Sequence, residues 1–92
     1  MMRIQFRKEA EMDLRLIVSH YQDVAPEAVD GILADIYRTI DQLVRFPNSG
    51  MRVHNRQFRR IVTLKCHFKI AYEVTESQVI ILGIFRYQNR EI

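Results

Sequence analysis

The first half of the chain changes the spacing of its apolar positions from two residues to three or four. Residues 2–6 alternate between apolar and polar side chains, which predicts a half-buried strand. Residues 8–22 place an apolar side chain every three or four positions, as one face of a helix does. A second apolar stripe runs through residues 27–45. Pro26 suits the first turn of that helix, because its missing N–H would have no intrahelical partner there.

The second half of the chain is typical of short strands separated by turns. Residues 52–55 form a weak strand candidate, and residues 58–64 form a stronger one that is rich in β-branched side chains. Residues 68–74 alternate between two faces. Residues 79–86 are apolar on both faces, which predicts a central strand. We expect residues 87–92 to be irregular.

Together these elements predict an α+β fold with the order β-α-α-β-β-β. The two helices form a hairpin that packs on a small, mainly antiparallel sheet, because a sheet face is the only large surface that can bury both apolar stripes. The last three strands form a meander, and the first strand returns to the sheet. We expect a single domain over residues 1–92, with the second face of the sheet open or covered by a partner.

Size and composition exclude several classes of protein. A chain of 92 residues has a thin core and little room for an enclosed cofactor, so we expect no cofactor and a function on an open face. The single cysteine, Cys66, allows no intramolecular disulfide and fits the reducing cytoplasm. The longest apolar run, Val79–Leu82, is too short to cross a membrane, and the N-terminus lacks the apolar segment of a signal peptide.

Basic residues are concentrated in the second half of the chain. Residues 1–46 carry six Lys/Arg and eight Asp/Glu, whereas residues 47–92 carry eight Lys/Arg and three Asp/Glu. The stretch from Arg52 to Lys69 holds six basic residues and no acid. Such a stretch attracts polyanions or acidic protein surfaces. The alternative is a solvated sheet face that has no partner.

Few residues suit metal binding or nucleophilic catalysis. His20, His54 and His67 lie far apart in the sequence, and no Cys/His pair has the spacing of a zinc site, so we expect no metal site. Cys66 and His67 could form a nucleophile pair only if a turn brought them together, because adjacent residues on a strand point to opposite faces.

Basic and aromatic residues near the ends of the predicted strands are better candidates. An antiparallel meander would bring Arg59 near Arg86, and grouped arginines grip phosphates or carboxylates with forked hydrogen bonds. A nearby tyrosine could stack on a base or donate a proton. Tyr72, in contrast, shares a strand face with Phe68 and Ile70, which favours a core role. The predicted target-binding residues are Arg59, Arg60, Lys65, Arg86, Tyr87 and Arg90.

A family resemblance is carried by the segments Ala10-x-x-Asp13-Leu14-x-x-Ile17-x-x-x-Tyr21, Leu43-x-x-Phe46-Pro47-x-x-Gly50, Phe68-x-Ile70-x-Tyr72-x-Val74 and Val79-x-Ile81-Leu82-Gly83-Ile84-Phe85-Arg86. In this order and spacing the chain resembles the toxins of the RelE/ParE superfamily, and the ParE branch most closely. The resemblance covers nearly the whole chain.

The resemblance implies the toxin component of a bacterial type II toxin–antitoxin system, held in a hetero-oligomer by a small cognate antitoxin. We expect that partner on the open sheet face or in a groove along the helical hairpin. Toxins of the ParE branch inhibit DNA gyrase without chemistry of their own, cause growth arrest and serve plasmid maintenance. Toxins of the RelE branch are ribosome-dependent mRNA endonucleases. A third alternative is an inactive relative that keeps only the antitoxin-binding fold.

The end of the last predicted strand departs from both branches. Arg86-Tyr87 matches the start of the Arg-Tyr-His-Tyr ending of YoeB-like nucleases, but Gln88 and Asn89 stand in place of the His and the second Tyr. Neither amide takes up a proton near neutral pH, which favours the gyrase alternative. If the chain is a nuclease, the resemblance makes Arg59, Arg86 and Tyr87 the catalytic candidates; otherwise we expect none. Residues that could take the missing proton-transfer role are Tyr87, His67 and Glu73.

Overall fold

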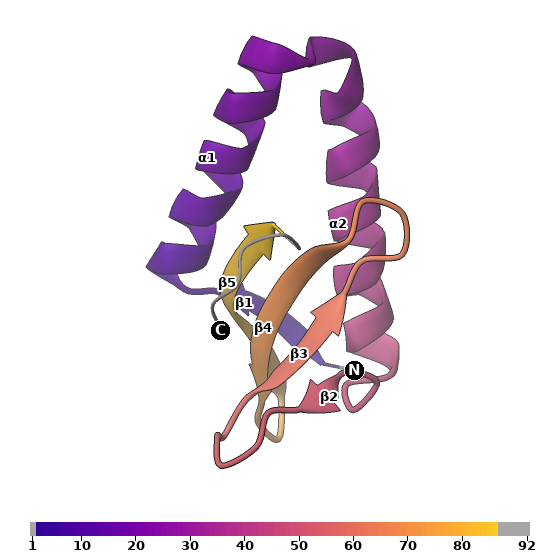
Figure 1. The fold of residues 1–92 in the computed structure, drawn as a ribbon. Helices are drawn as coiled ribbons and strands as arrows, with labels where there is room; N and C mark the ends of the chain where they lie inside the picture. The colour runs from indigo at the N-terminus through magenta and orange to yellow at the C-terminus, as the bar shows by residue number, and fades with distance from the viewer. Residues whose placement is uncertain (1, 87–92) are drawn as a thin grey trace.

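The computed structural model describes residues 2–86 and shows a helical hairpin beside a twisted sheet (Figure 1). The two helices meet at their connection and diverge toward the sheet, so that they form a V. The elements are β1 (Arg3–Phe6), α1 (Lys8–Val24), the 3₁₀ turn η1 (Pro26–Ala28), α2 (Val29–Arg45), β2 (Met51–Arg52), β3 (Arg59–Val62), β4 (Phe68–Val74) and β5 (Gln78–Arg86).

The strands form one five-stranded sheet in the order β1-β5-β4-β3-β2. Strands β2 to β5 pair antiparallel in sequence order, whereas β1 pairs parallel with β5. This arrangement confirms the predicted α+β fold, the meander, the return of the first strand and an interior position for the last one, between β1 and β4. The sheet has one strand more than the predicted order β-α-α-β-β-β, because β2 pairs with β3 at its edge.

A β-bulge in β5 changes which of its residues face the core. Leu82 is an extra residue between the pairs Tyr72–Ile81 and Ala71–Gly83. An extra residue shifts the alternation of faces by one position. A strict alternation would place some residues before and after Leu82 on opposite faces of the sheet. Because of the bulge, these residues face the core together. This explains why β5 reads as apolar on both faces in the sequence.

The helix boundaries differ from the sequence prediction by two residues. α1 continues to Val24, beyond the predicted end at residue 22. α2 begins at Val29 rather than at residue 27, because η1 precedes it as a short 3₁₀ turn. Pro26 opens that turn, where its fixed backbone angle fits and no N–H is needed. No helix in the described part of the chain is long and apolar enough to cross a membrane.

The strand boundaries differ from the sequence prediction because of two turns. The weak strand predicted over residues 52–55 is confined to β2, since Asn55 has a φ of 59°, a left-handed conformation that does not continue a strand. β3 ends before Thr63, whose hydroxyl accepts a hydrogen bond of 2.9 Å from the N–H of Phe68 and closes the β3–β4 turn.

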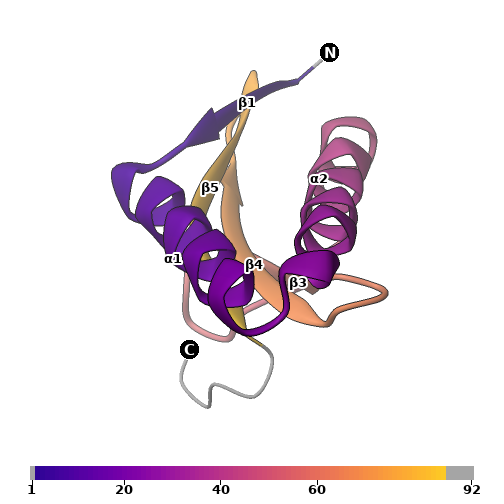
Figure 2. The same cartoon turned by 90° about the horizontal axis from the view of Figure 1, so that it is seen from above.

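One hydrophobic core joins both helices to the sheet, and Figure 2 shows the helices flanking the twisted strands. Ile17 comes from α1, Ile36 and Leu43 from α2, and Ile70 and Tyr72 from β4. The side chain of Tyr72 is fully buried, which confirms its predicted core role. The core therefore fixes the angle of the V and the position of each surface described below.

Candidate functional site

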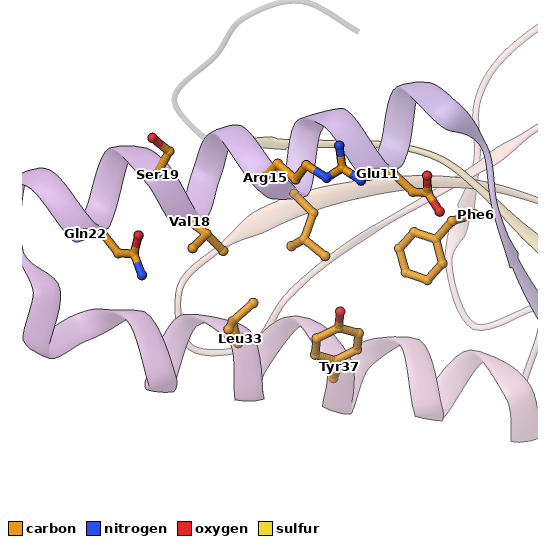
Figure 3. A pocket seen from close by; sticks show the side chains of 9 residues that line it. Phe6, Glu11, Arg15, Val18, Ser19, Gln22, Leu33 and Tyr37 are labelled. Carbon is orange, nitrogen blue, oxygen red and sulfur yellow. The ribbon is translucent and has the colours of Figure 1, made fainter.

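A groove runs between α1 and α2 where the helices diverge. Its volume is about 510 Å³. Figure 3 shows side chains of both helices, together with Phe6 of β1, directed into the gap. The residues that line it are Phe6, Glu11, Leu14, Arg15, Val18, Ser19, Gln22, Leu33 and Tyr37.

The groove has an apolar floor and a polar rim. Val18 and Leu33 face each other across it, and Tyr37 keeps 49% of its surface exposed. Glu11 and Arg15 lie on the α1 side of the opening. An exposed apolar groove of this kind suits the apolar face of a helical segment from a partner.

Arg59, a predicted target-binding residue, is tied to the turn that follows α2. Its Nη1 donates hydrogen bonds to the carbonyl oxygens of Gly50 at 2.9 Å and Asn48 at 3.4 Å. The hydroxyl of Tyr72 donates to the Pro47 carbonyl at 2.8 Å and accepts from the Gly50 N–H at 2.9 Å. Burial raises the pKa of Tyr72, against the hydrogen bond from Gly50 and the charge of Arg59, so the hydroxyl keeps its proton as a donor.

The strand register separates Arg59 from Arg86. Arg59 pairs with Tyr72 of β4, and Arg86 pairs with Phe68 of the same strand. The two β4 residues are about 13 Å apart along the strand, and β3 and β5 lie roughly 10 Å apart on opposite sides of β4. The expectation that the meander brings Arg59 near Arg86 is therefore wrong.

Arg86 instead meets a histidine from α1. Its Nη1 lies 3.1 Å from Nε2 of His20, at an opening of about 250 Å³ that Asp13 also lines. The carboxylate of Asp13 accepts a hydrogen bond of 3.0 Å from the N–H of Ile84, which holds α1 against the edge of β5. His20 is absent from the predicted site residues because it lies 66 positions from Arg86. No local pattern connects the two.

Lys65 lies in the β3–β4 turn, which a buried carboxylate from α2 holds in place. Asp35 accepts hydrogen bonds from the N–H groups of Lys65 at 3.2 Å and Cys66 at 2.7 Å, and its side chain is 1% exposed. Burial by itself raises the pKa of Asp35, but these bonds and one from Thr63 outweigh it and hold the pKa below its ordinary value. The turn presents the exposed Lys65 side chain to solvent.

The surroundings of Cys66 disfavour a nucleophile. Burial and the negative charge of Asp35 raise the pKa of its thiol, so the reactive thiolate is less populated than in an ordinary cysteine. Among residues 2–86, no three His, Cys, Asp or Glu side chains are grouped so that they could hold a metal ion.

The remaining predicted site residues are distributed over other parts of the chain. Arg60 follows Arg59 on β3 and therefore points to the other face of the sheet, beside its pairing partner Ala71. Tyr87 and Arg90 lie outside the described residues. The predicted set is thus divided between two faces of the sheet and both ends of its strands.

Comparison with known proteins gives the same fold. The profile of the family described as "ParE toxin of type II toxin-antitoxin system, parDE" matches residues 4–90. The chain is similar to a structure of the chromosomal ParDE system from P. aeruginosa, with 24% identity, a TM-score of 0.81 and coverage of 96% of this chain and 98% of that chain.

Two further solved structures are similar at lower identity. One is a chain of the intact E. coli RelBE toxin–antitoxin complex, with 9% identity, a TM-score of 0.66 and coverage of 97% and 100%. The other is a conserved hypothetical protein from Helicobacter pylori, with 17% identity, a TM-score of 0.60 and coverage of 92% and 93%. Among curated proteins, no sequence matches this chain significantly.

Proposed function

This chain belongs to the ParE toxin family of type II toxin–antitoxin systems, and from that premise we propose that it inhibits DNA gyrase and is neutralised by a cognate antitoxin. The inhibitor acts as a binding surface in the cytoplasm and forms no covalent intermediate. Its contacts to the target come from basic residues, of which Lys65 and Arg86 lie at the same end of β4. Tyr87 and Arg90, which follow Arg86 in the sequence, remain further candidates for target contacts.

The observation that carries the proposal is the separation of Arg59 from Arg86. A nuclease that used both side chains would need them within reach of one phosphate, because transition-state charge is stabilised by donors at about 3 Å. The register instead places the two arginines at different ends of β4, on strands to either side of it. Nη1 of Arg59 also donates its hydrogen bonds to the turn after α2. This geometry favours a binding surface over a catalytic centre.

The groove between α1 and α2 is the proposed binding site of the antitoxin. Two of the similar structures are named for pairs of toxin and antitoxin, the P. aeruginosa ParDE system and the E. coli RelBE complex. An amphipathic helix could bury apolar side chains against Val18 and Leu33, with a polar flank along Arg15 and Glu11. Acidic residues of the same partner would complement the acid-free stretch from Arg52 to Lys69.

A second candidate function is ribosome-dependent mRNA cleavage, and the contact between His20 and Arg86 favours it. A neutral imidazole accepts a proton and a guanidinium holds a phosphate, so the pair has the groups for acid–base work on a phosphodiester. His20→Gln keeps a hydrogen-bond acceptor for Arg86 but cannot take up a proton. A nuclease would lose activity with this variant, whereas a gyrase inhibitor would keep it.

The deciding experiment is a supercoiling and cleavage assay with purified gyrase and the full chain freed from its antitoxin. Lys65→Ala/Arg86→Ala removes two charges from the proposed contact surface. Lys8→Ala/Arg15→Ala removes the same charge from α1 and is the matched control. Inhibition that falls with the first pair and not with the second supports the proposal.

A further inference from the structure

The hairpin of β2 and β3 carries an arginine-lined pocket that the toxin activity leaves unexplained. The pocket has a volume of about 280 Å³ and is lined by residues of the connection between the two strands. That connection lies at the lower end of the sheet in Figure 1. Arg52, Arg56 and Arg59 all line the pocket, together with Asn48 and the half-buried Phe58. None of its lining residues is an acid.

The fold brings the three arginines together from one short segment. Arg52 of β2 pairs with Arg59 of β3. The connection between them is closed by hydrogen bonds from the Val53 N–H to the Phe58 carbonyl at 3.3 Å and from the Arg56 N–H to the Val53 carbonyl at 3.0 Å. The paired backbone therefore keeps the three arginines around one pocket, whereas a free loop would let them spread apart.

Part of this site is already oriented. Nη1 of Arg59 donates to the carbonyl oxygens of Gly50 and Asn48, which fixes the plane of its guanidinium. A guanidinium has five N–H donors, and the hydrogen bonds of Arg59 to other described residues use Nη1 alone, so Nε and Nη2 can serve a ligand. Arg52 and Arg56 are exposed, so their side chains are free to close on an anion in the pocket.

The charge of the pocket is uncompensated in the described part of the chain. Arg38 and Arg45 each form an ion pair with an aspartate of their own helix, but neither described ion pair includes an arginine of the pocket. Because the three arginines line one small pocket, their like charges repel one another, and an anion with several acceptor oxygens would relieve that repulsion. Planar guanidinium forks match the oxygens of a phosphate in particular.

We propose that this pocket binds a backbone phosphate of single-stranded nucleic acid, with the neighbouring base against Phe58. A basic groove beside an aromatic ring is the arrangement by which proteins hold single strands without sequence preference. An acidic peptide would satisfy the arginines but would leave the ring without a stacking partner. The site does not depend on gyrase inhibition, and it lies apart from the His20–Arg86 contact, since β3 and β5 are on opposite sides of β4.

The test measures binding of a fluorescein-labelled twelve-nucleotide single strand to the full chain by fluorescence anisotropy, between about 50 and 200 mM salt. Arg52→Ala/Arg56→Ala should weaken binding at least tenfold and lower the slope of log K against log salt by up to about 0.7, because the pocket holds one phosphate and single strands give roughly 0.7 per phosphate contact. Lys8→Ala/Arg15→Ala removes the same charge from α1, which does not line the pocket, and should have a markedly smaller effect.

Three outcomes would overturn the proposal. The first is equal binding losses in the two double variants. The second is that inorganic phosphate displaces the strand at the same concentration from the wild type and from Arg52→Ala/Arg56→Ala. Phosphate would then bind outside this pocket. The third is displacement of the strand by polyglutamate as effectively as by unlabelled oligonucleotide of the same charge, which identifies an acidic-peptide site. Circular dichroism of each variant checks the fold. No gyrase is present, so failure here leaves the gyrase proposal untouched.

Discussion

The carboxylate of Asp35 on α2 accepts a hydrogen bond of 2.7 Å from the backbone N–H of Cys66, 31 residues later in the chain. A second bond, from the N–H of Lys65, completes the clamp at 3.2 Å. The contact joins the middle of a helix to a sheet turn and orients Lys65, a residue of the proposed target surface. A buried charge therefore links fold stability to the position of a residue in the proposed target surface.

Asp35→Asn should lower the free energy of unfolding by about 2 kcal/mol at pH 7, because hydrogen bonds to a charged group contribute roughly 1.5–3 kcal/mol. The side-chain amide of this variant could accept from only one of the two N–H groups without turning its NH₂ toward the other. Urea unfolding measures the change. Asp41→Asn, which breaks an exposed ion pair with Arg45, is the control and should cost less than about 0.5 kcal/mol.

The hydrogen bonds to the Asp35 carboxylate also predict that the free energy of unfolding depends on pH. The pKa of Asp35 is lowered in the folded state, so its stabilisation is complete above the unfolded pKa of about 3.9 and is lost as pH falls through the folded value. The difference in unfolding free energy between wild type and Asp35→Asn should therefore shrink below about pH 4. A difference that stays constant from pH 7 to pH 3 would show that the lost stability has another origin.

Tyr72→Phe should destabilise the protein by roughly 1–3 kcal/mol, because it leaves the Gly50 N–H and the Pro47 carbonyl without their partner. Thermal melting measures the loss. Tyr37→Phe removes a hydroxyl from a ring that is 49% exposed and should change stability little. Equal effects of the two variants would mean that the turn after α2 does not depend on Tyr72.

Replacing either of two glycines by alanine should change the stability of the protein, in opposite directions at the two positions. A Cβ at Gly50 would lie 2.8 Å from the backbone oxygen of Arg60 and 2.6 Å from the Tyr72 hydroxyl, so Gly50→Ala should cost about 1–3 kcal/mol. A Cβ at Gly31 in α2 meets nothing within 4 Å, and Gly31→Ala should stabilise by about 0.5–1 kcal/mol. Denaturant midpoints that move in the same direction would contradict the packing described here.

Two arginine substitutions in α1 test the proposal that the antitoxin binds in the groove between α1 and α2. Val18→Arg places a guanidinium on the apolar floor and should weaken the complex with the cognate antitoxin at least tenfold, because a buried, unpaired charge is costly. Leu16→Arg changes a residue of α1 that is 60% exposed and does not line the groove, and should leave affinity unchanged. Titration calorimetry gives both affinities, and a greater loss with Leu16→Arg would place the antitoxin elsewhere.

Much of the fold follows from patterns that are local in sequence. The apolar periods of residues 8–22 and 27–45 locate both helices, and the double-sided apolar run after residue 78 identifies the central strand. The bulge at Leu82 contributes to that double-sided run, but the run does not reveal its position, which is set by pairing with β4. The short extent of β2 depends on a left-handed residue, Asn55, that the sequence alone does not require.

The candidate site was harder to predict, because it depends on strand register and on contacts distant in sequence. Arg59 carries the charge expected of a target-binding residue, yet its hydrogen bonds to Gly50 and Asn48 give it a structural role. His20 reads as a surface residue of the first helix until the fold places it beside Arg86. The groove between the helices was expected from the hairpin, but its lining depends on the angle of the V.

The most direct test of the central claim is the supercoiling activity of purified gyrase in the presence of this protein refolded free of antitoxin. The proposed function predicts loss of supercoiling together with accumulated cleaved DNA, and recovery when the cognate antitoxin is added. Undiminished supercoiling, at protein concentrations that arrest growth when the chain is expressed alone, would contradict gyrase inhibition and move the target to the ribosome.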